Sequence, residues 1–512
     1  MFDAKAGDLT LGVVGAGVMG RGIAQVAALA GLRVLLADAR AEAVAEGIDF
    51  AAGMIGRLAE KGKISQEQAD AARSRLVATD AGPDAGYGAF ADCDLVIEAV
   101  AERMDIKHAV LKGVEAAVRP DCVIATNTSS LSVTAFAAAA RHPERVAGFH
   151  FFNPVPLMRI VEVIAGARTD PAVCDALCAL AERMGHFPAR ATDTPGFLVN
   201  HAGRAYGTEA VRIVSEGIAT FADIDRVMVE IAGFRMGPFE LMDLTGLDVS
   251  HTVMEQVYHQ YYEEPRFRPQ PLTAQRFAAG LFGRKTGEGF YTYKDGRRQV
   301  PDEPAPAEGS LIEHPVWVGE GAEADILADY LATIGIVASR EEKPGADDLC
   351  LVAPYGADVT TTALRRGLDA RHTVGIDLLF GLKERRCLMT SPVTARDYRD
   401  LAWRLFLADG GRVTCIHDSP GFIVQRILAS IVNTGSDIAQ QRIASPADIN
   451  KAVELGLGYP KGPLAFGDAL GGGRMLAILE EMQDFYGDPR YRPSPWLKRR
   501  ALLQVPLVTE EA

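Results

Sequence analysis

Residues 10–20 read TLGVVGAGVMG and decide the fold of the amino-terminal part of this chain. The apolar run Thr10–Val14 predicts a buried strand, the glycines that follow predict a tight turn, and the alanine-rich stretch Arg21–Ala30 predicts a helix. Gly31 ends that helix, and Leu32–Ala37 is a second apolar strand. This order of strand, glycine turn, helix and strand is typical of a Rossmann-type α/β domain that binds a dinucleotide.

Each glycine of the turn has its own task in such a domain. Gly15 permits the turn, Gly17 lets a pyrophosphate approach the backbone, and Gly20 lets the helix pack closely on the strand. Asp38 follows the second strand, 18 residues after Gly20, where a carboxylate binds ribose hydroxyls and repels a 2′-phosphate. The sequence therefore predicts that the domain binds NAD and not NADP. Two alternatives are a glycine turn that binds nothing and an Asp38 that is only a surface charge. The residues expected to contact NAD at the turn are Gly15, Ala16, Gly17, Val18, Met19 and Gly20.

A helical insertion interrupts the domain after its second strand. Ala41–Glu60 predicts one long helix, and the stretch from Gln66 to about Arg75 predicts a second. The turn between them holds Lys61 and Lys63 in an otherwise acidic protein. Two interpretations remain open for these lysines, namely a solvated loop or a clamp for the phosphates of a large anionic substrate.

The sheet resumes with two more apolar runs, at residues 94–100 and 122–126. The second run is followed directly by Asn127 and Ser129. Open α/β sheets bind their ligands just beyond the carboxyl ends of the strands. Asn127 and Ser129 are therefore candidate site residues.

A histidine and a glutamate are placed symmetrically about a proline. Val146–Phe149 is an apolar run that ends at His150, and Ile160–Ile164 predicts a strand that contains Glu162. If the chain reverses at Pro156, which is six residues from each, the two side chains lie opposite each other. A histidine that takes a proton from an alcohol needs such a carboxylate to fix its tautomer and stabilise the imidazolium. The pair is the predicted catalytic centre.

One segment of the chain occurs twice. Residues 195–243 realign without a gap onto residues 420–468, every position being shifted by 225 (420 − 195). A register of this length predicts a helical module that is used twice. Asn200 in the first copy becomes Gln425 in the second, which suggests that one copy is catalytic and the other is a structural relative.

Composition excludes several classes of protein. The net charge of −14 argues against nucleic acid as a partner, because the phosphate backbone would be repelled. No apolar run is long enough to span a bilayer, and the amino terminus lacks an apolar signal core, so we expect a cytoplasmic chain. Its 7 scattered cysteines indicate reduced thiols, and no metal site is expected because Cys174 and Cys178 lack further ligands nearby.

Several ordered motifs resemble one enzyme family. They are the glycine turn, residues 127–130 (NTSS), 150–154 (HFFNP), 193–200 (DTPGFLVN), 237–240 (GPFE) and 283–291 (GRKTGEGFY). Together they look like the NAD-dependent L-3-hydroxyacyl-CoA dehydrogenases, over about residues 9–294. The repeated helical module resembles the long bacterial members that are linked to phenylacetate degradation and oxidise 3-hydroxyadipyl-CoA.

The resemblance implies a role for individual residues. His150 would be the base that removes the 3-hydroxyl proton, Glu162 its orienting carboxylate, and Ser129 and Asn200 would bind the substrate. Lys61 or Lys63 would contact coenzyme A, and the sequence does not choose between them. The residues that match the family's NAD contacts, besides the turn and Asp38, are Glu102, Lys107, Asn127, Asn153 and Lys285.

The second half is expected to be a degenerate copy of the first. Residues 316–322 begin like another glycine turn but then fail, so no second NAD is expected. Asp377, Met389 and Gln425 are predicted to occupy the positions of His150, Glu162 and Asn200. In short relatives the helical domain mediates dimerisation, so its copy here would supply that surface within one chain.

The predicted architecture is an α/β Rossmann-type domain and an all-α domain, followed by a degenerate α/β unit and a second α domain. The expected bounds are 1–194 with the insertion 41–79, then 195–296, 310–411 and 412–495. Two alternatives to an acyl-CoA dehydrogenase are a dehydrogenase of free hydroxy acids or sugar acids and a non-catalytic structural protein. The acyl group, and whether the chain forms a homodimer or homo-oligomer, stay open.

Overall fold

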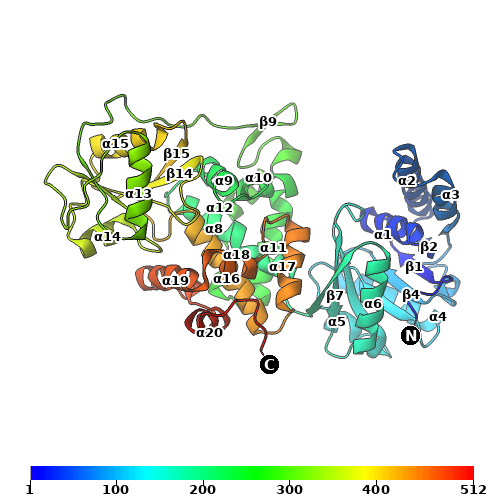
Figure 1. Ribbon diagram of the computed structural model, residues 1–512. Helices are drawn as coiled ribbons and strands as arrows, with labels where there is room; N and C mark the ends of the chain where they lie inside the picture. The colour runs from blue at the N-terminus through cyan, green and yellow to red at the C-terminus, as the bar shows by residue number, and fades with distance from the viewer. Residues whose placement is uncertain (1, 512) are drawn as a thin grey trace. The chain divides into compact units, whose positions relative to one another are not determined.

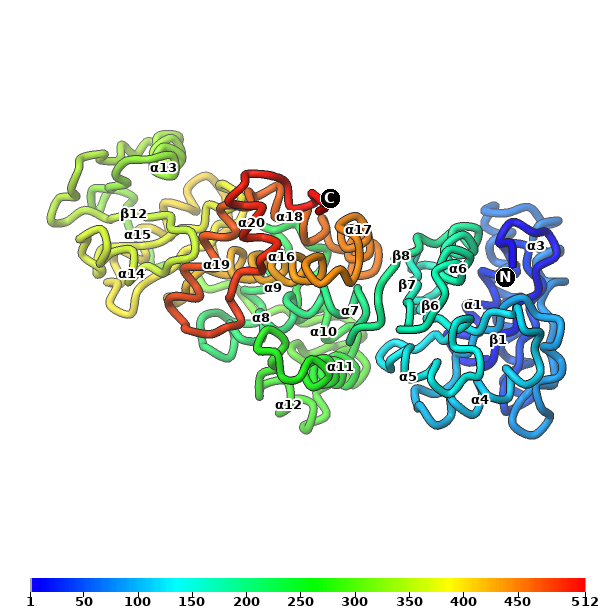
Figure 2. Tube along the Cα trace, turned by 90° about the horizontal axis from the view of Figure 1, so that it is seen from below, coloured from blue at the N-terminus to red at the C-terminus, as the bar shows by residue number. Residues whose placement is uncertain are grey.

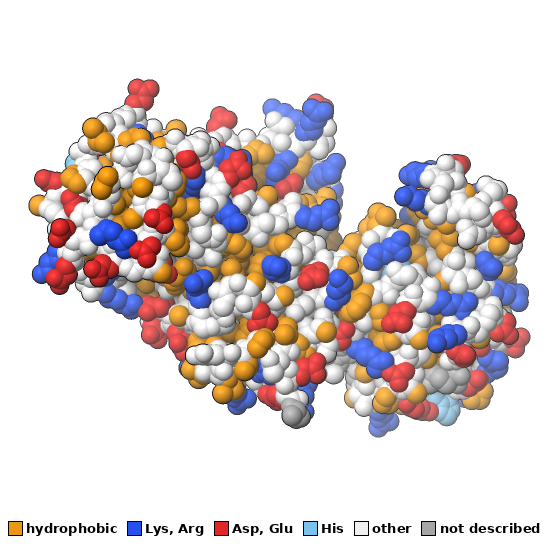
Figure 3. All heavy atoms as spheres, in the orientation of Figure 1, with side chains coloured by type: hydrophobic (Ala, Val, Ile, Leu, Met, Phe, Trp, Pro, Cys, Tyr) orange, Lys and Arg blue, Asp and Glu red, His pale blue; other side chains and the backbone are white. Residues whose placement is uncertain are grey.

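The computed structural model describes residues 2–511 and divides into two compact units (Figure 1). The first comprises residues 2–201 and 441–457, and the second comprises residues 202–440 and 458–511. Acidic and basic side chains are interspersed on the face shown in Figure 3, with apolar side chains between them. Among the helices within residues 2–511, none combines the length and the apolar composition that a bilayer-spanning helix requires.

The first unit is built on an eight-stranded sheet with the order β3-β2-β1-β4-β5-β6-β7-β8. Neighbouring strands run parallel, except that β7 runs antiparallel to β6. The strands are β1 (Thr10–Val14), β2 (Arg33–Ala37), β3 (Leu76–Ala78), β4 (Leu95–Glu98), β5 (Val123–Thr126), β6 (Val146–Phe151), β7 (Ile160–Ala165) and β8 (Phe187–Thr192).

Helices cover both faces of this sheet, which accounts for its nearly continuous apolar strands. One core joins strand residues such as Val13 to α1 and α6, and the other joins Val14 to α4 and α5. The helices of this unit are α1 (Val18–Leu29), α2 (Ala41–Glu60), α3 (Gln66–Ser74), α4 (Met104–Ala117), α5 (Val133–Ala137), α6 (Pro171–Arg183), the start of α7 (Val199–Ala202), and α17 (Pro446–Leu457).

The strands and helices predicted between residues 10 and 75 are present, with shifts of a few residues at some of their ends. The strand at residues 10–14 and the helix at residues 41–60 have the expected bounds. Helix α3 begins where predicted because Ser65 accepts a hydrogen bond from the backbone N–H of Gln68 and forms a capping box. Helix α1 begins earlier than expected, at Val18, because the last residues of the glycine turn already adopt the helical conformation.

The second unit contains a smaller five-stranded sheet with the order β11-β12-β13-β14-β15. Its strands are β11 (Val316–Trp317), β12 (Leu349–Val352), β13 (Thr373–Ile376), β14 (Arg385–Thr390) and β15 (Arg412–His417), and its helices are α13 (Ala322–Thr333), α14 (Val359–Arg366) and α15 (Arg396–Leu407). A separate hairpin joins β9 (Thr292–Lys294) and β10 (Arg297–Gln299). Because β15 continues the sheet, this domain ends after residue 417 and not at the predicted residue 411.

Strand pairing corrects the interpretation of residues 316–322. In the first sheet Thr126 of β5 pairs with Gly148 of β6, and in the second sheet Val352 of β12 pairs with Gly375 of β13. With β12 in the place of β5, β11 takes the place of β4 and not of β1. Within residues 2–511 the second sheet has no counterpart of β1, β2 or β3, the strands that carry a dinucleotide turn.

The rest of the second unit is helical, and the repeat is confirmed. Helices α10 (Pro238–Thr245) and α18 (Pro463–Leu470) differ by the predicted 225 residues at both ends. The first module also contains α8 (Arg204–Ser215), α9 (Phe221–Glu230), α11 (Leu247–Gln260) and α12 (Pro271–Ala278), and the second contains α16 (Val424–Gln440), α19 (Gly472–Tyr486) and α20 (Pro495–Leu503). The second module therefore extends beyond the predicted residue 495.

The two helical modules pack on each other with approximate two-fold symmetry. Helix α8 lies against α16. Arg266 of the first module donates to the carbonyl of Arg492 at 2.8 Å, and Arg490 of the second donates to the carbonyl of Arg268 at 3.0 Å. These are equivalent residues, shifted by 224 (490 − 266 and 492 − 268). Such a reciprocal exchange is what a two-fold relation between the modules requires.

The last strand of each sheet is hydrogen-bonded to a residue of the helical module that belongs to the other repeat. The Thr192 N–H at the end of β8 donates to the Ile443 carbonyl at 2.9 Å, within the first unit. The His417 N–H at the end of β15 donates to the Ile218 carbonyl at 3.0 Å, within the second unit. Both pairs of equivalent residues are shifted by 225. Helix α17 of the second module thus lies beside β8 (Figure 2), although about 250 residues separate them along the chain.

Candidate active site

The glycine turn leaves space for a pyrophosphate. Gly15 has φ +107°, and a Cβ on it would lie 2.5 Å from the carbonyl oxygen of Ala99. A Cβ on Gly20 would lie 1.7 Å from the Gly15 oxygen, so this position must be glycine for α1 to pack on β1. Gly17 has nothing within 4 Å of the Cβ position, and no side chain caps α1. The first turn of α1 can therefore present its backbone N–H groups to an anion.

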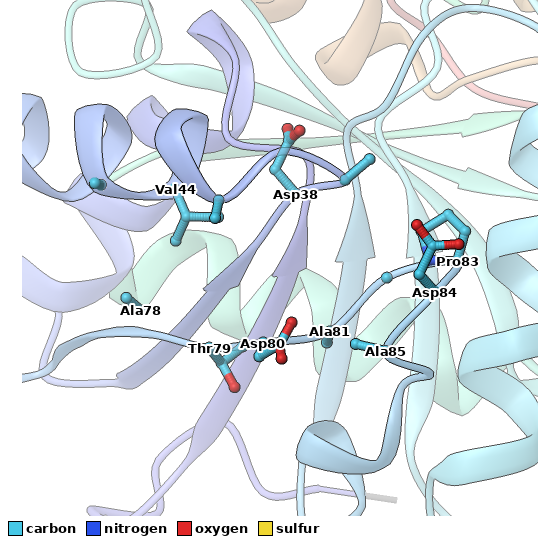
Figure 4. A pocket seen from close by; sticks show the side chains of 13 residues that line it. Asp38, Val44, Ala78, Thr79, Asp80, Ala81, Pro83, Asp84 and Ala85 are labelled. Carbon is cyan, nitrogen blue, oxygen red and sulfur yellow. The ribbon is translucent and has the colours of Figure 1, made fainter.

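Asp38 lies between this turn and a cavity of about 510 Å³. One carboxylate oxygen accepts from the backbone N–H of Ala16 at 2.8 Å and the other from Arg40 N–H at 3.1 Å, so both oxygens have fixed positions. Figure 4 shows that Asp38 after β2, Val44 of α2, and Asp80 and Asp84 after β3 line this cavity. The volume is in the range of about 300–1,000 Å³ that is usual for ligand pockets, and three carboxylates along it disfavour a phosphate on the ribose.

Glu102 connects the segments that follow β4 and β5. Its Oε1 accepts from the Thr128 hydroxyl at 2.7 Å and from the backbone N–H groups of Ser129 and Ser130 at 2.9 and 3.0 Å. The Ser129 hydroxyl lies 3.3 Å from the same oxygen and is exposed. Burial raises the pKa of Glu102, but the charge of Lys107 and the hydrogen bond from Thr128 outweigh it and lower that pKa. Glu102 is therefore a charged carboxylate that accepts these hydrogen bonds and holds Ser129 in place.

Lys107 lies inside the protein, with 1% of its surface exposed. Its Nζ lies 2.8 and 3.0 Å from the two carboxylate oxygens of Glu98 and 3.3 Å from Glu102. Glu98 also accepts a hydrogen bond from the Thr126 hydroxyl. The structure thus makes Lys107 an internal partner of two glutamates, Glu98 at the end of β4 and Glu102 shortly after it. Sequence reasoning missed Glu98, although a glutamate that ends an apolar strand is a recognisable signal.

Asn127 fixes the strand that carries the histidine. Its side-chain oxygen accepts from the backbone N–H of Phe151 at 2.8 Å, and the residue is buried. His150 is therefore held from the β5 side as well as by its own strand. His150 lies within β6, one residue before the strand ends at Phe151.

His150 and Glu162 form the predicted pair. They are directly opposed in the antiparallel ladder of β6 and β7, and His150 Nδ1 lies 2.6 Å from Glu162 Oε2. Both are buried, with 5% and 0% of their surfaces exposed. Because the carboxylate accepts from Nδ1–H, the other ring nitrogen, Nε2, carries the lone pair that can take a proton.

The second oxygen of Glu162 is held by the backbone. Glu162 Oε1 accepts from the N–H groups of Leu198 and Val199 at 3.0 and 2.8 Å. These donors are presented by the Pro-Gly-Phe turn, in which Phe197 has φ +48°. Sequence reasoning identified this turn as a repeat marker but did not connect it to the carboxylate. The glutamate is thus fixed at both oxygens, which fixes the imidazole ring in turn.

The remaining predicted residues lie at several places. Asn153 is exposed just beyond β6, and Asn200 lies in α7, directly after the backbone donors to Glu162. Lys61 and Lys63 are both exposed in the turn between α2 and α3. Lys285 belongs to the second unit, where it pairs with Asp248. No cluster of histidine, cysteine or carboxylate side chains suited to a metal ion occurs within residues 2–511.

The equivalent centre of the second unit has different chemistry, and one predicted equivalence is wrong. Gly375 pairs with Met389 as Gly148 pairs with Ile164, so Met389 replaces Ile164 and not Glu162. The Asp377 N–H donates to the Cys387 carbonyl at 3.0 Å, which makes Cys387 the counterpart of Glu162. The loop between these strands is two residues shorter than in the first unit, since 387 − 377 is 10 and 162 − 150 is 12.

A glutamine fills this second centre. The Gln425 amide donates to Asp377 at 2.9 Å and accepts from the Gly356 N–H at 2.8 Å. Burial raises the pKa of Asp377 to about 6, and the same cause raises the pKa of the Cys387 thiol well above its ordinary value. Asp377 is 5% exposed. Within this unit the position of the histidine is therefore occupied by a carboxyl group that is closed off by protein.

Comparison with known proteins extends these observations. The model of the 3-hydroxyacyl-CoA dehydrogenase NAD binding domain matches residues 10–194, and that of the 3-hydroxyacyl-CoA dehydrogenase C-terminal domain matches residues 196–293 and again 421–505. The 3-hydroxyadipyl-CoA dehydrogenase of Escherichia coli is 36% identical over 97% of this chain and 98% of its own length. The 3-hydroxybutyryl-CoA dehydrogenase of Bradyrhizobium diazoefficiens is 40% identical over 57% of this chain and 97% of its own length. A crystal structure of 3-hydroxybutyryl-CoA dehydrogenase from Escherichia coli superposes with a TM-score of 0.84 at 35% identity, covering 97% of this chain and 98% of that one.

Proposed function

This chain belongs to the 3-hydroxyacyl-CoA dehydrogenase family, and we propose that it oxidises L-3-hydroxyacyl-CoA to 3-oxoacyl-CoA with NAD. The observation that carries the proposal is the His150–Glu162 pair, which lies in the same sheet as an open glycine turn. An alcohol oxidation of this kind removes a hydride from carbon 3 and a proton from the hydroxyl oxygen. A cofactor site and a proton acceptor are the two groups that this reaction needs.

His150 is the proton acceptor in this proposal. With Nδ1 bonded to Glu162, Nε2 takes the hydroxyl proton, and the carboxylate stabilises the positive charge that the ring acquires. Glu162 is itself held by two backbone N–H groups, so its oxygens do not turn away when the charge forms. The proton is later released to water, and the ring returns to its neutral form.

The cofactor would be held by residues of the first unit. The glycine turn and the first turn of α1 would bind the pyrophosphate, and Asp38 would bind the adenosine ribose. NAD supplies the hydride acceptor at such a site. Glu102 orients Ser129 at the ends of the neighbouring strands, where the substrate hydroxyl and the nicotinamide are expected to meet.

For the acyl group we propose a dicarboxylyl chain such as 3-hydroxyadipyl. The support is the match to the Escherichia coli 3-hydroxyadipyl-CoA dehydrogenase along nearly the whole of both chains. The terminal carboxylate of such a chain requires a cation in the acyl pocket.

A panel of acyl-CoA substrates tests this part of the proposal. NADH formation would be compared for 3-hydroxybutyryl-, 3-hydroxyhexanoyl- and 3-hydroxyadipyl-CoA. The hexanoyl and adipyl chains have equal length and differ only in the terminal carboxylate, so they form a matched pair. We expect kcat/KM for the adipyl chain to exceed that for the hexanoyl chain at least tenfold, which is about 1.4 kcal/mol. A preference for the hexanoyl chain would contradict the dicarboxylyl proposal and leave the dehydrogenase proposal standing.

A second prediction concerns the role of the second unit. We expect each chain to bind one NAD, because the second sheet lacks counterparts of β1–β3 within the described residues. Asp377→Ala should leave kcat within about twofold, since the carboxyl group is closed off by Gln425 and is not part of the first centre. Calorimetric titration with NAD measures the stoichiometry. Two equivalent sites per chain, or a large loss of turnover in Asp377→Ala, would show that the second centre is functional.

A further inference from the structure

Helix α17 is a part of the first unit that is supplied by the second half of the chain. By sequence it belongs to the second helical module, as the counterpart of α9. In the structure residues 441–457 form one compact unit with residues 2–201. The Ile443 carbonyl before this helix accepts the hydrogen bond from Thr192 at the end of β8. The element that supports the active unit is thus encoded more than 200 residues away from it.

Gly456 of α17 lies close to the active unit. A Cβ added at Gly456 would lie 2.9 Å from Cγ1 and 3.2 Å from Cγ2 of Val199. Real Cβ atoms do not approach a neighbour within 3.0 Å, so any other residue would displace Val199 or the helix. Its φ lies outside the left-handed region, so glycine is required here by space and not by backbone conformation.

The equivalent residue of the first module is not small. Position 456 corresponds to Ile231 (456 − 225), which is buried. Helix α9, which Ile231 follows, lies against β14, in the sheet where Cys387 replaces the glutamate. Of the two modules, the one that packs on the His150 centre has glycine at this position. The close approach is therefore a property of the catalytic side of the molecule.

Val199 connects this glycine to the catalytic pair. Its side chain is fully buried, and its backbone N–H donates to Glu162 Oε1 at 2.8 Å. Glu162 Oε2 lies 2.6 Å from His150 Nδ1. A shift of Val199 therefore moves a donor of the carboxylate that orients the base. The path from Gly456 to His150 passes through two residues, both without exposed surface.

We propose that Gly456 is a positioning residue for the reaction, and that the second helical module takes part in catalysis by setting the geometry of Glu162 and His150 through Val199. This inference rests on the proposed function. In this proposal the second half of the chain contributes to the active unit by packing, and its own side chains take no part in the chemical steps.

The test uses the full chain with Gly456→Ala and Gly456→Val. We expect kcat to fall in both, by about tenfold to a hundredfold in Gly456→Val, because a displacement of about 1 Å can cost a hundredfold. The KM values for NAD and acyl-CoA should change less than threefold, because α17 packs on β7 and β8, whereas the glycine turn and Asp38 follow β1 and β2. Gly473→Ala and Gly473→Val are matched controls in α19 of the same module, where nothing lies within 4 Å of the Cβ position. Both controls should keep the wild-type kcat.

Rescue distinguishes positioning from loss of stability. Val199→Ala removes the atoms that a side chain at residue 456 would meet but keeps the backbone donor to Glu162. The double variant Gly456→Ala/Val199→Ala should therefore recover the kcat of Val199→Ala alone. Wild-type kcat in Gly456→Val, or equal losses of kcat in the Gly456 and Gly473 variants, would overturn the inference. An inactive wild-type chain would instead contradict the proposed function, so the two failures can be told apart.

Discussion

His150→Gln is expected to lower kcat about a hundredfold or more, within the range that loss of a general base produces. Glutamine can still donate a hydrogen bond to Glu162, so the strand pairing and the buried carboxylate stay satisfied. It cannot accept a proton at neutral pH, so the hydroxyl proton has no acceptor when the hydride leaves. Steady-state NADH formation measures kcat, and calorimetry measures NAD affinity, which should change little.

The control for this variant is another histidine of the same unit. His108 lies in α4, whereas His150 and Glu162 lie in β6 and β7, and its ring contacts the Ala135 carbonyl at 3.0 Å. His108→Gln should keep turnover within about twofold. If His150→Gln keeps most of its turnover, His150 is a structural histidine and the proposed mechanism is wrong.

Deletion of residues 418–512 is expected to abolish activity and to give an aggregating protein. It removes α17 from β8 and α16 from α8, and α16 has buried residues along nearly its whole length. Newly exposed apolar surface of this extent promotes association. The measurements are the soluble yield, the scattering of the purified chain and its turnover.

The deletion also breaks a buried charge cluster. Glu209 lies 3.3 Å from Arg490 and accepts from the Tyr491 hydroxyl at 2.6 Å, and it also pairs with Arg426. Burial raises the pKa of Glu209, but the charges of Arg426 and Arg490 outweigh it and lower that pKa to about 2. Removal of one partner from a buried ion pair costs about 3–5 kcal/mol. Deletion of residues 510–512 alone is the control, and a soluble and active product of the large deletion would show that the second module does not support the first unit.

The sequence predicts the catalytic pair because strand geometry is regular. Two strands that reverse about Pro156 bring His150 and Glu162 into register, and each strand has a period of two residues. The same regularity explains the error at Met389. The loop of the second unit is shorter by two residues, so a constant offset selects a residue on the correct face but two residues further along the strand. Only the observed pairing identifies Cys387.

Other features depend on tertiary contacts that a sequence does not contain. The sequence signal of Lys107 is the same whether this lysine binds a ligand or a buried glutamate. Its burial and its ion pair with Glu98 show that it binds the glutamate. The repeat predicts that a second helical module exists. It does not predict which of the two sheets that module packs against. The exchange of α17 onto β8 is visible only in the contacts of the folded chain, namely the Thr192–Ile443 hydrogen bond and the packing of α17 on β8.

In the mechanism proposed above, the first unit oxidises a 3-hydroxyacyl-CoA with NAD. The most direct test is NADH formation by the purified full chain with L-3-hydroxybutyryl-CoA, compared with free L-3-hydroxybutyrate, and with NADP in place of NAD. We predict turnover with the CoA ester and NAD, at least tenfold lower kcat/KM with NADP because of Asp38, and no measurable turnover of the free acid. Turnover of the free acid but not of the ester, or no turnover of any 3-hydroxyacyl-CoA, would contradict the account.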